Sequence, residues 1–199
     1  RLFSAKIIEL ALSNYPGFFA GGGVKSGGPV LIYWPALVDS KHINEVVHFN
    51  GKSKELKPTS QLNFEEIYYQ TEPVKIPDAP KGETSHVPLG TLFGARSGDK
   101  GGCANLGVWA KDLDAFAFLS SFLTIEKLKE LMPDLKEFKI ERFDLPNILS
   151  LNFYIHDILE DGVSSNSRKD AQAKSLGEYL RAKKANIPSS LLETLNEYG

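Results

Sequence analysis

Cysteine is almost absent from the sequence, which has a single one, Cys103, among its 199 residues. An internal disulfide is therefore impossible, as is usual for proteins of a reducing compartment. We expect an intracellular protein, in the cytoplasm or, in a eukaryote, in the mitochondrial matrix. Histidine is also scarce, and the four histidines show no metal-ligand spacing. We therefore expect no bound metal.

Long apolar runs and an excess of charge of one sign are missing as well. No stretch of about 18 apolar residues could span a membrane, and no basic-then-apolar signal segment opens the chain. The formal net charge is −2, which points to neither nucleic acid nor an anionic membrane as a partner. No P-loop, dinucleotide fingerprint or Gly-x-Ser-x-Gly elbow occurs, so we expect no cofactor. The first residue is Arg1 rather than Met, which suggests a piece of something longer.

The first 70 residues contain few elements and many glycines. The pattern predicts a helix at 5–14 capped by Ser4, a glycine-rich loop at 20–29, a buried strand at 30–34, a strand at 43–49 that turns at Asn50-Gly51, and a short helix or strand at 63–69. These elements are too sparse to bury a core alone. We interpret residues 1–70 as the incomplete α/β edge of a larger domain, or as an arm packed on another chain.

A proline-rich segment then marks the best domain boundary. Residues 71–88 contain four prolines and few large apolar residues, so we expect a linker at 71–85 and a second domain at 86–199. The pattern predicts strands at 88–95 and 103–110, a helical region at 113–131 with Thr124 as an internal N-cap, strands at 138–143 and 148–155, a helix at 171–183 and a tail helix after Pro188. The predicted fold class is α+β, a ββαββα domain with helices on one face of a four-stranded antiparallel sheet.

The segment between the first two strands is unusually long and charged for a hairpin turn. It reads Arg96-Ser97-Gly98-Asp99-Lys100-Gly101-Gly102. Backbone N–H groups of a glycine-rich turn can form an anion-binding nest, and Arg96 and Lys100 would add positive charge. The segment could equally be a solvated turn, or an edge that docks on another domain.

Two further polar clusters lie in the second half of the chain. Asn147 follows a Leu-Pro corner, and a regular strand would place Asn152 on one face with Ser150, Tyr154 and His156. Arg168 and Lys174 lie near the expected start of the 171–183 helix, where an anion is favoured. Each cluster can also be read structurally, as hydrogen bonds at the sheet corners and as a solvated basic helix face. Cys103 is best interpreted as an inert thiol.

Several motifs together resemble a known family. "TLFGARSGDKGGCANLGVWA", "LPN", "LNF" and "SRKDAQAK" are similar to the C-terminal domain of the AtuA-like family, the acyclic terpene utilisation proteins. The similarity covers about residues 86 to 190, and residues 1–70 resemble the tail of the family's larger N-terminal domain. The resemblance implies a ferredoxin-like fold and an association with the breakdown of acyclic terpenoids or branched acyl-CoA. It assigns no reaction and no catalytic residue.

The motif residues are therefore the predicted ligand-binding site. They are Arg96, Ser97, Gly98, Asp99, Lys100, Gly101, Asn105, Asn147, Asn152, Arg168, Asp170, Gln172 and Lys174. We expect the charged segment, the Asn147 corner and the region from Arg168 to Lys174 to converge on one surface. That surface could bind a carboxylate or acyl-CoA as part of an active site shared with the N-terminal domain. Alternatively, the domain is a non-catalytic module for subunit or domain assembly, and a homo-oligomer is expected. An RNA-binding sheet is disfavoured by the acidic net charge.

Overall fold

The computed structural model describes residues 2–11, 13, 16, 27–29, 31–32, 34–56 and 73–193. The chain divides into two compact units, one up to Ile32 and one from Tyr33 onward. The predicted element at 63–69 and most of the glycine-rich loop at 20–29 lie outside the described residues. No described helix is long and apolar enough to cross a membrane.

Among its described residues, the N-terminal unit contains the helix α1, at Leu2–Ala11. Ser4 lies inside this helix, so the prediction of Ser4 as its N-cap was wrong. The predicted buried strand at 30–34 was also wrong, because Leu31, Ile32 and Trp34 belong to no strand and are exposed. Apolar composition predicted burial there, but burial requires a partner surface, and the described residues provide none at this segment.

A separate hairpin follows, after a short 3-10 turn, η1, at Ser40–His42. Its strands, β1 at Glu45–Phe49 and β2 at Lys52–Leu56, pair antiparallel around Asn50 and Gly51. Both turn residues have positive φ (48° and 71°), which confirms the hairpin predicted from Asn-Gly. Every residue of both strands is exposed, so this hairpin contributes nothing to a core.

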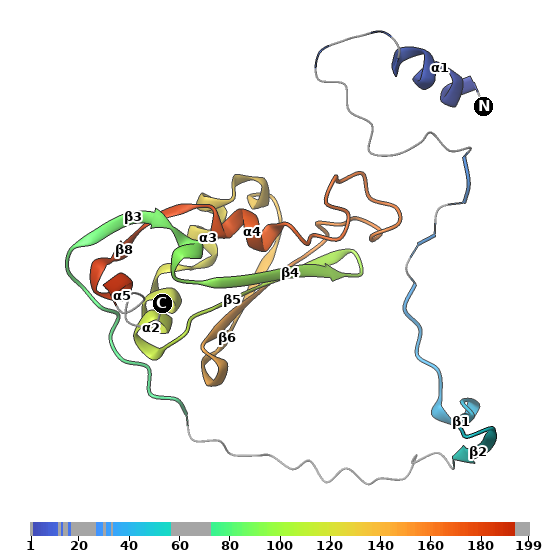
Figure 1. Ribbon diagram of the computed structural model, residues 1–199, viewed down its shortest axis with the longest axis horizontal. Helices are drawn as coiled ribbons and strands as arrows, with labels where there is room; N and C mark the ends of the chain where they lie inside the picture. The colour runs from blue at the N-terminus through green and yellow to red at the C-terminus, as the bar shows by residue number, and fades with distance from the viewer. Residues whose placement is uncertain are drawn as a thin grey trace. The chain divides into compact units, whose positions relative to one another are not determined.

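The C-terminal part is built on a four-stranded antiparallel sheet in the order β4-β5-β7-β6 (Figure 1). Its strands are β4 at Gly94–Lys100, β5 at Cys103–Trp109, β6 at Ile140–Leu145 and β7 at Ser150–Ile155. Between the two hairpins lie α2 at Leu113–Phe122, α3 at Ile125–Leu131 and the 3-10 turn η3 at Pro133–Leu135. The 3-10 turn η4 at Pro146–Ile148 joins β6 to β7, and α4 at Leu176–Arg181 follows the sheet.

This arrangement confirms the α+β class and the ββαββα order. Moving the first strand to the end of that order gives βαββαβ, the order of elements in a ferredoxin-like fold. The C-terminal part therefore has the ferredoxin-like arrangement with its order of elements circularly shifted by one strand. β5 and β6 both pair with β7, and the helical crossover joins them.

Helices cover one face of the sheet, and alternate strand residues point toward them. Along β5 and β7 these residues are fully buried: Ala104, Leu106, Val108, Leu151, Phe153 and Ile155. They join Phe116 and Leu119 from α2, Leu123 at its C-cap, Leu128 from α3 and Leu180 from α4 in one core. Thr124 is confirmed as the N-cap of α3, since its hydroxyl accepts a hydrogen bond from the Lys127 amide at 3.1 Å.

A second, two-stranded sheet was not predicted. It pairs β3 at Thr84–Pro88 with β8 at Lys184–Pro188, and the 3-10 turn η2 at Leu89–Thr91 connects β3 to β4. The expected helix at 171–183 is shorter, because α4 begins only at Leu176, after Ala173 has taken a positive φ of 52° that a helix does not allow. The tail helix is confirmed as α5, at Ser189–Glu193. Tyr179 of α4 is 41% exposed, and the Lys183 ammonium lies 3.8 Å from its ring centroid.

The prediction that residues 96–102 form a charged loop was wrong. β4 continues through Lys100, and only Gly101 and Gly102 make the turn to β5. Gly101 has φ of 64°, and a side chain on Gly102 would collide with the carbonyl oxygen of Glu160. Charged residues can occupy a strand here because Arg96 and Lys100 point away from the core and stay exposed.

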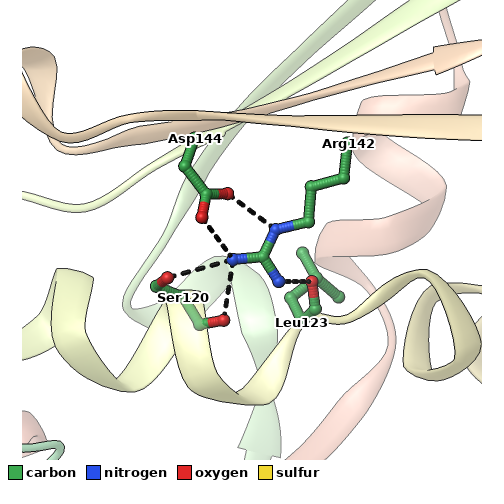
Figure 2. Close-up of polar contacts among 4 residues, drawn as sticks. All are labelled: Ser120, Leu123, Arg142 and Asp144. Carbon is green, nitrogen blue, oxygen red and sulfur yellow. Dashed lines mark hydrogen bonds and ion pairs between the residues drawn. The ribbon is translucent and has the colours of Figure 1, made fainter.

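Arg142 joins β6 to the end of α2 (Figure 2). Its guanidinium donates to the carbonyl oxygens of Ser120 at 2.8 Å and Leu123 at 3.1 Å, and to the Ser120 hydroxyl at 3.0 Å. It also forms a two-pronged ion pair with Asp144, at 2.7 and 3.1 Å. The last carbonyls of a helix lack partners within the helix, so Arg142 satisfies two acceptors at the α2–α3 junction.

Candidate functional site

The face of the sheet opposite the helices carries most of the predicted site residues of the strands. Strand alternation places Arg96, Gly98 and Lys100 of β4 on this open face, together with Asn105 of β5 and Asn152 of β7. The register joins them in rows, because Gly98 lies opposite Asn105, and Gly107 lies between Arg96 and Asn152. The chain thus brings five of the thirteen candidate residues onto one surface.

Two asparagines form the polar centre of this open face. The Asn105 side-chain amide donates to the Asn152 side-chain oxygen at 3.3 Å, and both side chains are half-buried. Gly98 and Gly107 leave open space beside this pair, since a Cβ added at either position meets no atom closer than 3.7 Å. The remaining amide oxygen and N–H groups of the pair therefore lie beside two positions without side chains, where a ligand could approach them.

A pocket at the edge of β4 adjoins the open face and has a volume of 320 Å³. Its lining comes from β4 and from the start of α4: Ala95, Arg96, Ser97, Lys174, Gly177 and Glu178. Gly177 allows the close approach, because a Cβ there would lie 3.3 Å from the backbone of Ala95 and Arg96. Its amide donates to the Ser97 hydroxyl at 2.9 Å, which fixes the helix against the strand.

The pocket carries more positive charge than its own contacts neutralise. Within the part of the chain that the structure describes, neither the Arg96 guanidinium nor the Lys174 ammonium forms a hydrogen bond or ion pair. Glu178 also lines the pocket, but both of its carboxylate oxygens accept from Arg181 at 3.0 Å. Ser97 accepts from Gly177, so its own O–H remains available to donate. Two cations and a hydroxyl are the donors that a carboxylate or phosphate requires.

Asp170 has a structural role beside this pocket. Its carboxylate accepts from the amides of Lys174 at 2.9 Å and Ser175 at 2.8 Å, and from the Ser175 hydroxyl at 2.6 Å. Partial burial by itself would raise the pKa of Asp170, but these hydrogen bonds and nearby Arg168 lower it below its ordinary value. Asp170 therefore orders the turn that carries Lys174, and it is poorly suited to hold a ligand itself.

The remaining candidates lie elsewhere. Arg168 lines a second pocket, of 440 Å³, together with Asp170, Glu178 and Tyr179. Gln172 is exposed in the loop before α4, and Asp99 points to the helix-covered face. Asn147 lies in η4, next to the β6 and β7 ends that pair at Leu145 and Ser150. Because Lys100 and Gly101 lie at the other end of the sheet, the expected convergence on the Asn147 corner was wrong.

The sequence interpretation missed two features of the surface. The first is the close packing of Gly177 on β4, which an isolated glycine within a predicted helix often indicates. The open face also carries an apolar end, formed by Trp109, Phe143 and Leu145, which are 40%, 48% and 41% exposed. Strand alternation predicts Trp109 and Phe143 on the side opposite the core, so this end could have been found.

The opposite end of the open face holds a cluster of titratable side chains. His156 hydrogen-bonds to Glu141 through Nε2 at 2.9 Å, and the Tyr154 ring lies edge-on to the His156 ring at 4.9 Å. A hydrogen bond with the Cys103 thiol, together with burial, raises the pKa of Tyr154 above its ordinary value. Hydrogen bonds from Lys139 and His156 lower the pKa of Glu141. No group of metal-ligating side chains occurs in the described segments.

Comparison with known proteins agrees with this fold. The family model described as the AtuA ferredoxin-like domain matches residues 87–186, which is half of the chain. The chain belongs to this family. Neither the curated proteins nor the solved structures that were searched include a match. The matched AtuA ferredoxin-like region contains the whole four-stranded sheet, the asparagine pair and the pocket of Arg96 and Lys174. The open face and the pocket therefore belong to the family domain itself.

Proposed function

We propose that the AtuA ferredoxin-like domain of this chain binds a carboxylate or phosphate group at the pocket of Arg96, Ser97 and Lys174. The observation that carries the proposal is that two cationic side chains without partners among the described residues line the same pocket as a free hydroxyl donor. A planar guanidinium suits two-pronged recognition of either anion. The Asn105–Asn152 pair on the adjoining open face would position the rest of the ligand by hydrogen bonds.

Acyl-CoA is the ligand class that we propose, in the breakdown of acyclic terpenoids or branched acyl groups. The resemblance to acyclic terpene utilisation proteins supports this choice, and an acyl-CoA carries the phosphates that the pocket suits. In this proposal the domain supplies anion-binding residues to an active site completed by the family's N-terminal domain. The pocket offers binding and orientation, and none of its side chains is assigned a catalytic step.

Isothermal titration of the 199-residue chain with acyl-CoA, free CoA and inorganic phosphate tests the proposal. We expect Arg96→Ala and Lys174→Ala each to weaken binding by about tenfold or more, because each removes a charge-assisted hydrogen bond. Lys169→Ala is the matched control, since Lys169 is an exposed cation in the same loop but does not line the pocket. Equal affinity of all three variants and the unmodified chain would refute the proposal.

A second candidate function is a non-catalytic module for assembly. The apolar end of the open face favours it, because Trp109, Phe143, Leu145 and Ile148 are all at least 40% exposed. Contiguous exposed apolar side chains commonly mark interaction sites. Binding of the family's N-terminal domain that survives Arg96→Ala and Lys174→Ala, without any ligand binding, would favour this alternative.

A further inference from the structure

β6 is an outer strand of the four-stranded sheet and presents an unpaired edge. It pairs with β7 on one side, and among the described residues no strand pairs with its other side. An open edge offers a row of free N–H and C=O groups to another strand. The β4 edge differs, because α4 packs on it through Gly177. β6 is therefore the edge of this sheet that remains available for pairing.

The hydrogen-bond pattern shows which backbone groups of β6 are free. The His156 amide donates to the carbonyl oxygen of Lys139 at 3.0 Å, so the backbone of Lys139 points toward β7. Along an antiparallel strand this direction alternates with each residue. Phe143 consequently directs its backbone groups to β7, whereas Arg142 and Asp144 direct theirs to the open edge.

Two copies of β6 could pair antiparallel about a twofold axis in only a few registers. The free backbone groups must meet one another, and side chains on the same face must lie opposite each other. An axis through Arg142 would place it against Arg142 of the second copy, and an axis through Asp144 would place two carboxylates together. An axis through Phe143 places Arg142 opposite Asp144 of the second copy, twice by symmetry. Directly opposite like charges are unfavourable and opposite charges are favourable, so charge selects the register centred on Phe143.

The side chains on the open face suit the same register. Phe143, which is 48% exposed, would lie against Phe143 of the second copy. The apolar part of Glu141 would lie beside Leu145 of the second copy, and Leu145 is 41% exposed. Arg142 and Asp144, already paired at 2.7 Å within one copy, would form an alternating ring of four charges on the helix-covered face. A twofold axis perpendicular to the sheet keeps the helices of both copies on one side.

We propose that this protein forms a twofold-symmetric dimer through β6, centred on Phe143. The pairing joins the two sheets into one continuous antiparallel sheet of twice the number of strands. It leaves the pocket of Arg96 and Lys174 uncovered at the far edge, because β4 and β6 are the two outer strands. The proposal is independent of ligand binding at that pocket.

A cysteine placed at the axis tests both the contact and its register. In a Cys103→Ser background, which removes the natural thiol, Phe143→Cys puts two thiols in a non-hydrogen-bonded pair with Cα atoms about 4.5 Å apart, within disulfide range. Leu145→Cys is the matched control on the same strand and face, with similar exposure. In the proposed register the Cα atoms of position 145 in the two copies lie about 14 Å apart along the strands. This is too far for a disulfide, which requires less than about 7 Å between Cα atoms.

The measurement is the rate of covalent dimer formation by the full chain under mild oxidation, read on a non-reducing gel. We expect Phe143→Cys to form dimers at least about tenfold faster than Leu145→Cys, because only the first pair meets disulfide geometry. Similar rates for both, faster reaction of Leu145→Cys, or no covalent dimer with either would overturn the proposal. Sedimentation provides a second readout, in which Phe143→Lys places two ammonium groups at the axis and lowers the dimer fraction. Leu113→Lys, which introduces a lysine at a residue 42% exposed on α2, should leave the dimer fraction unchanged. Equal effects of the two lysine substitutions would also overturn it.

Discussion

Arg142 should contribute more to the free energy of unfolding through the two carbonyl groups that it satisfies than through its ion pair. Leu123 is 1% exposed, and the Arg142 side chain is itself only 17% exposed, so the α2 end has little access to water. Asp144 is 50% exposed, and an ion pair in contact with solvent contributes about 0–1 kcal/mol. An acceptor left without a donor in a buried site costs about 1–3 kcal/mol.

Replacing Arg142 by methionine keeps most of the side-chain length and removes every donor. Two carbonyl groups are then left without donors, and the surrounding structure relaxes in part. We therefore expect the free energy of unfolding to fall by about 3 kcal/mol. Arg142→Lys should cost less, because one ammonium can still reach one carbonyl. Asp144→Asn should cost less than about 1 kcal/mol, since it removes only the exposed ion pair.

Urea denaturation followed by circular dichroism measures these differences in the full chain. All variants should be compared at one dilute concentration, so that any self-association through β6 does not enter the result. Hydrogen exchange at the α2–α3 junction should accelerate in Arg142→Met before it does in β5. The reasoning fails if Arg142→Met is within about 0.5 kcal/mol of the unmodified chain, or if Asp144→Asn costs as much as Arg142→Met.

Two further predictions concern local features of the domain, a tight turn and a partly buried carboxylate. Gly102→Ala should lower the free energy of unfolding by about 1–3 kcal/mol, because its Cβ would collide with the backbone of Glu160. Gly98→Ala should be nearly neutral, because its Cβ would meet no atom closer than 3.9 Å. Denaturant midpoints of the two variants measure the difference, and equal costs would contradict the packing argument. Asp170→Asn should destabilise the chain by about 1 kcal/mol at neutral pH, as the loss of a helix cap does. The lowered pKa of Asp170 means that the folded state favours its ionised form, so this contribution is present above the unfolded pKa of about 3.9 and is lost as pH falls through the folded value. Unfolding measured from pH 7 to pH 3 should therefore show the difference between Asp170→Asn and the unmodified chain shrinking below about pH 4; a difference that stays constant across that range would contradict the assignment.

The sequence by itself determined the ββαββα order of the four-stranded sheet and its helices, although not the two-stranded sheet of β3 and β8. Alternation in 103–110 and 148–155, the helical spacing of 113–131 and the Thr124 cap are local patterns, and each has a direct physical cause in strand or helix geometry. The motifs were also sufficient to identify the family, which the match over residues 87–186 confirms. The Asn50-Gly51 turn was predictable for the same reason, because it depends on residues adjacent in the chain.

Only the tertiary structure decided how the candidate site is divided. Ser97 and Gly177 are 80 positions apart, and their contact depends on how α4 packs against β4. The charged segment of 96–100 looked like a loop because its charges do not favour burial, yet its pairing with β5 makes it a strand with a polar outer face. Asn147 was expected to lie beside the charged segment, but the sheet register places Lys100 and Gly101 at the opposite end of the sheet from it. Contacts between distant segments are set by the register and by the packing of the whole core, so no local pattern could have supplied them.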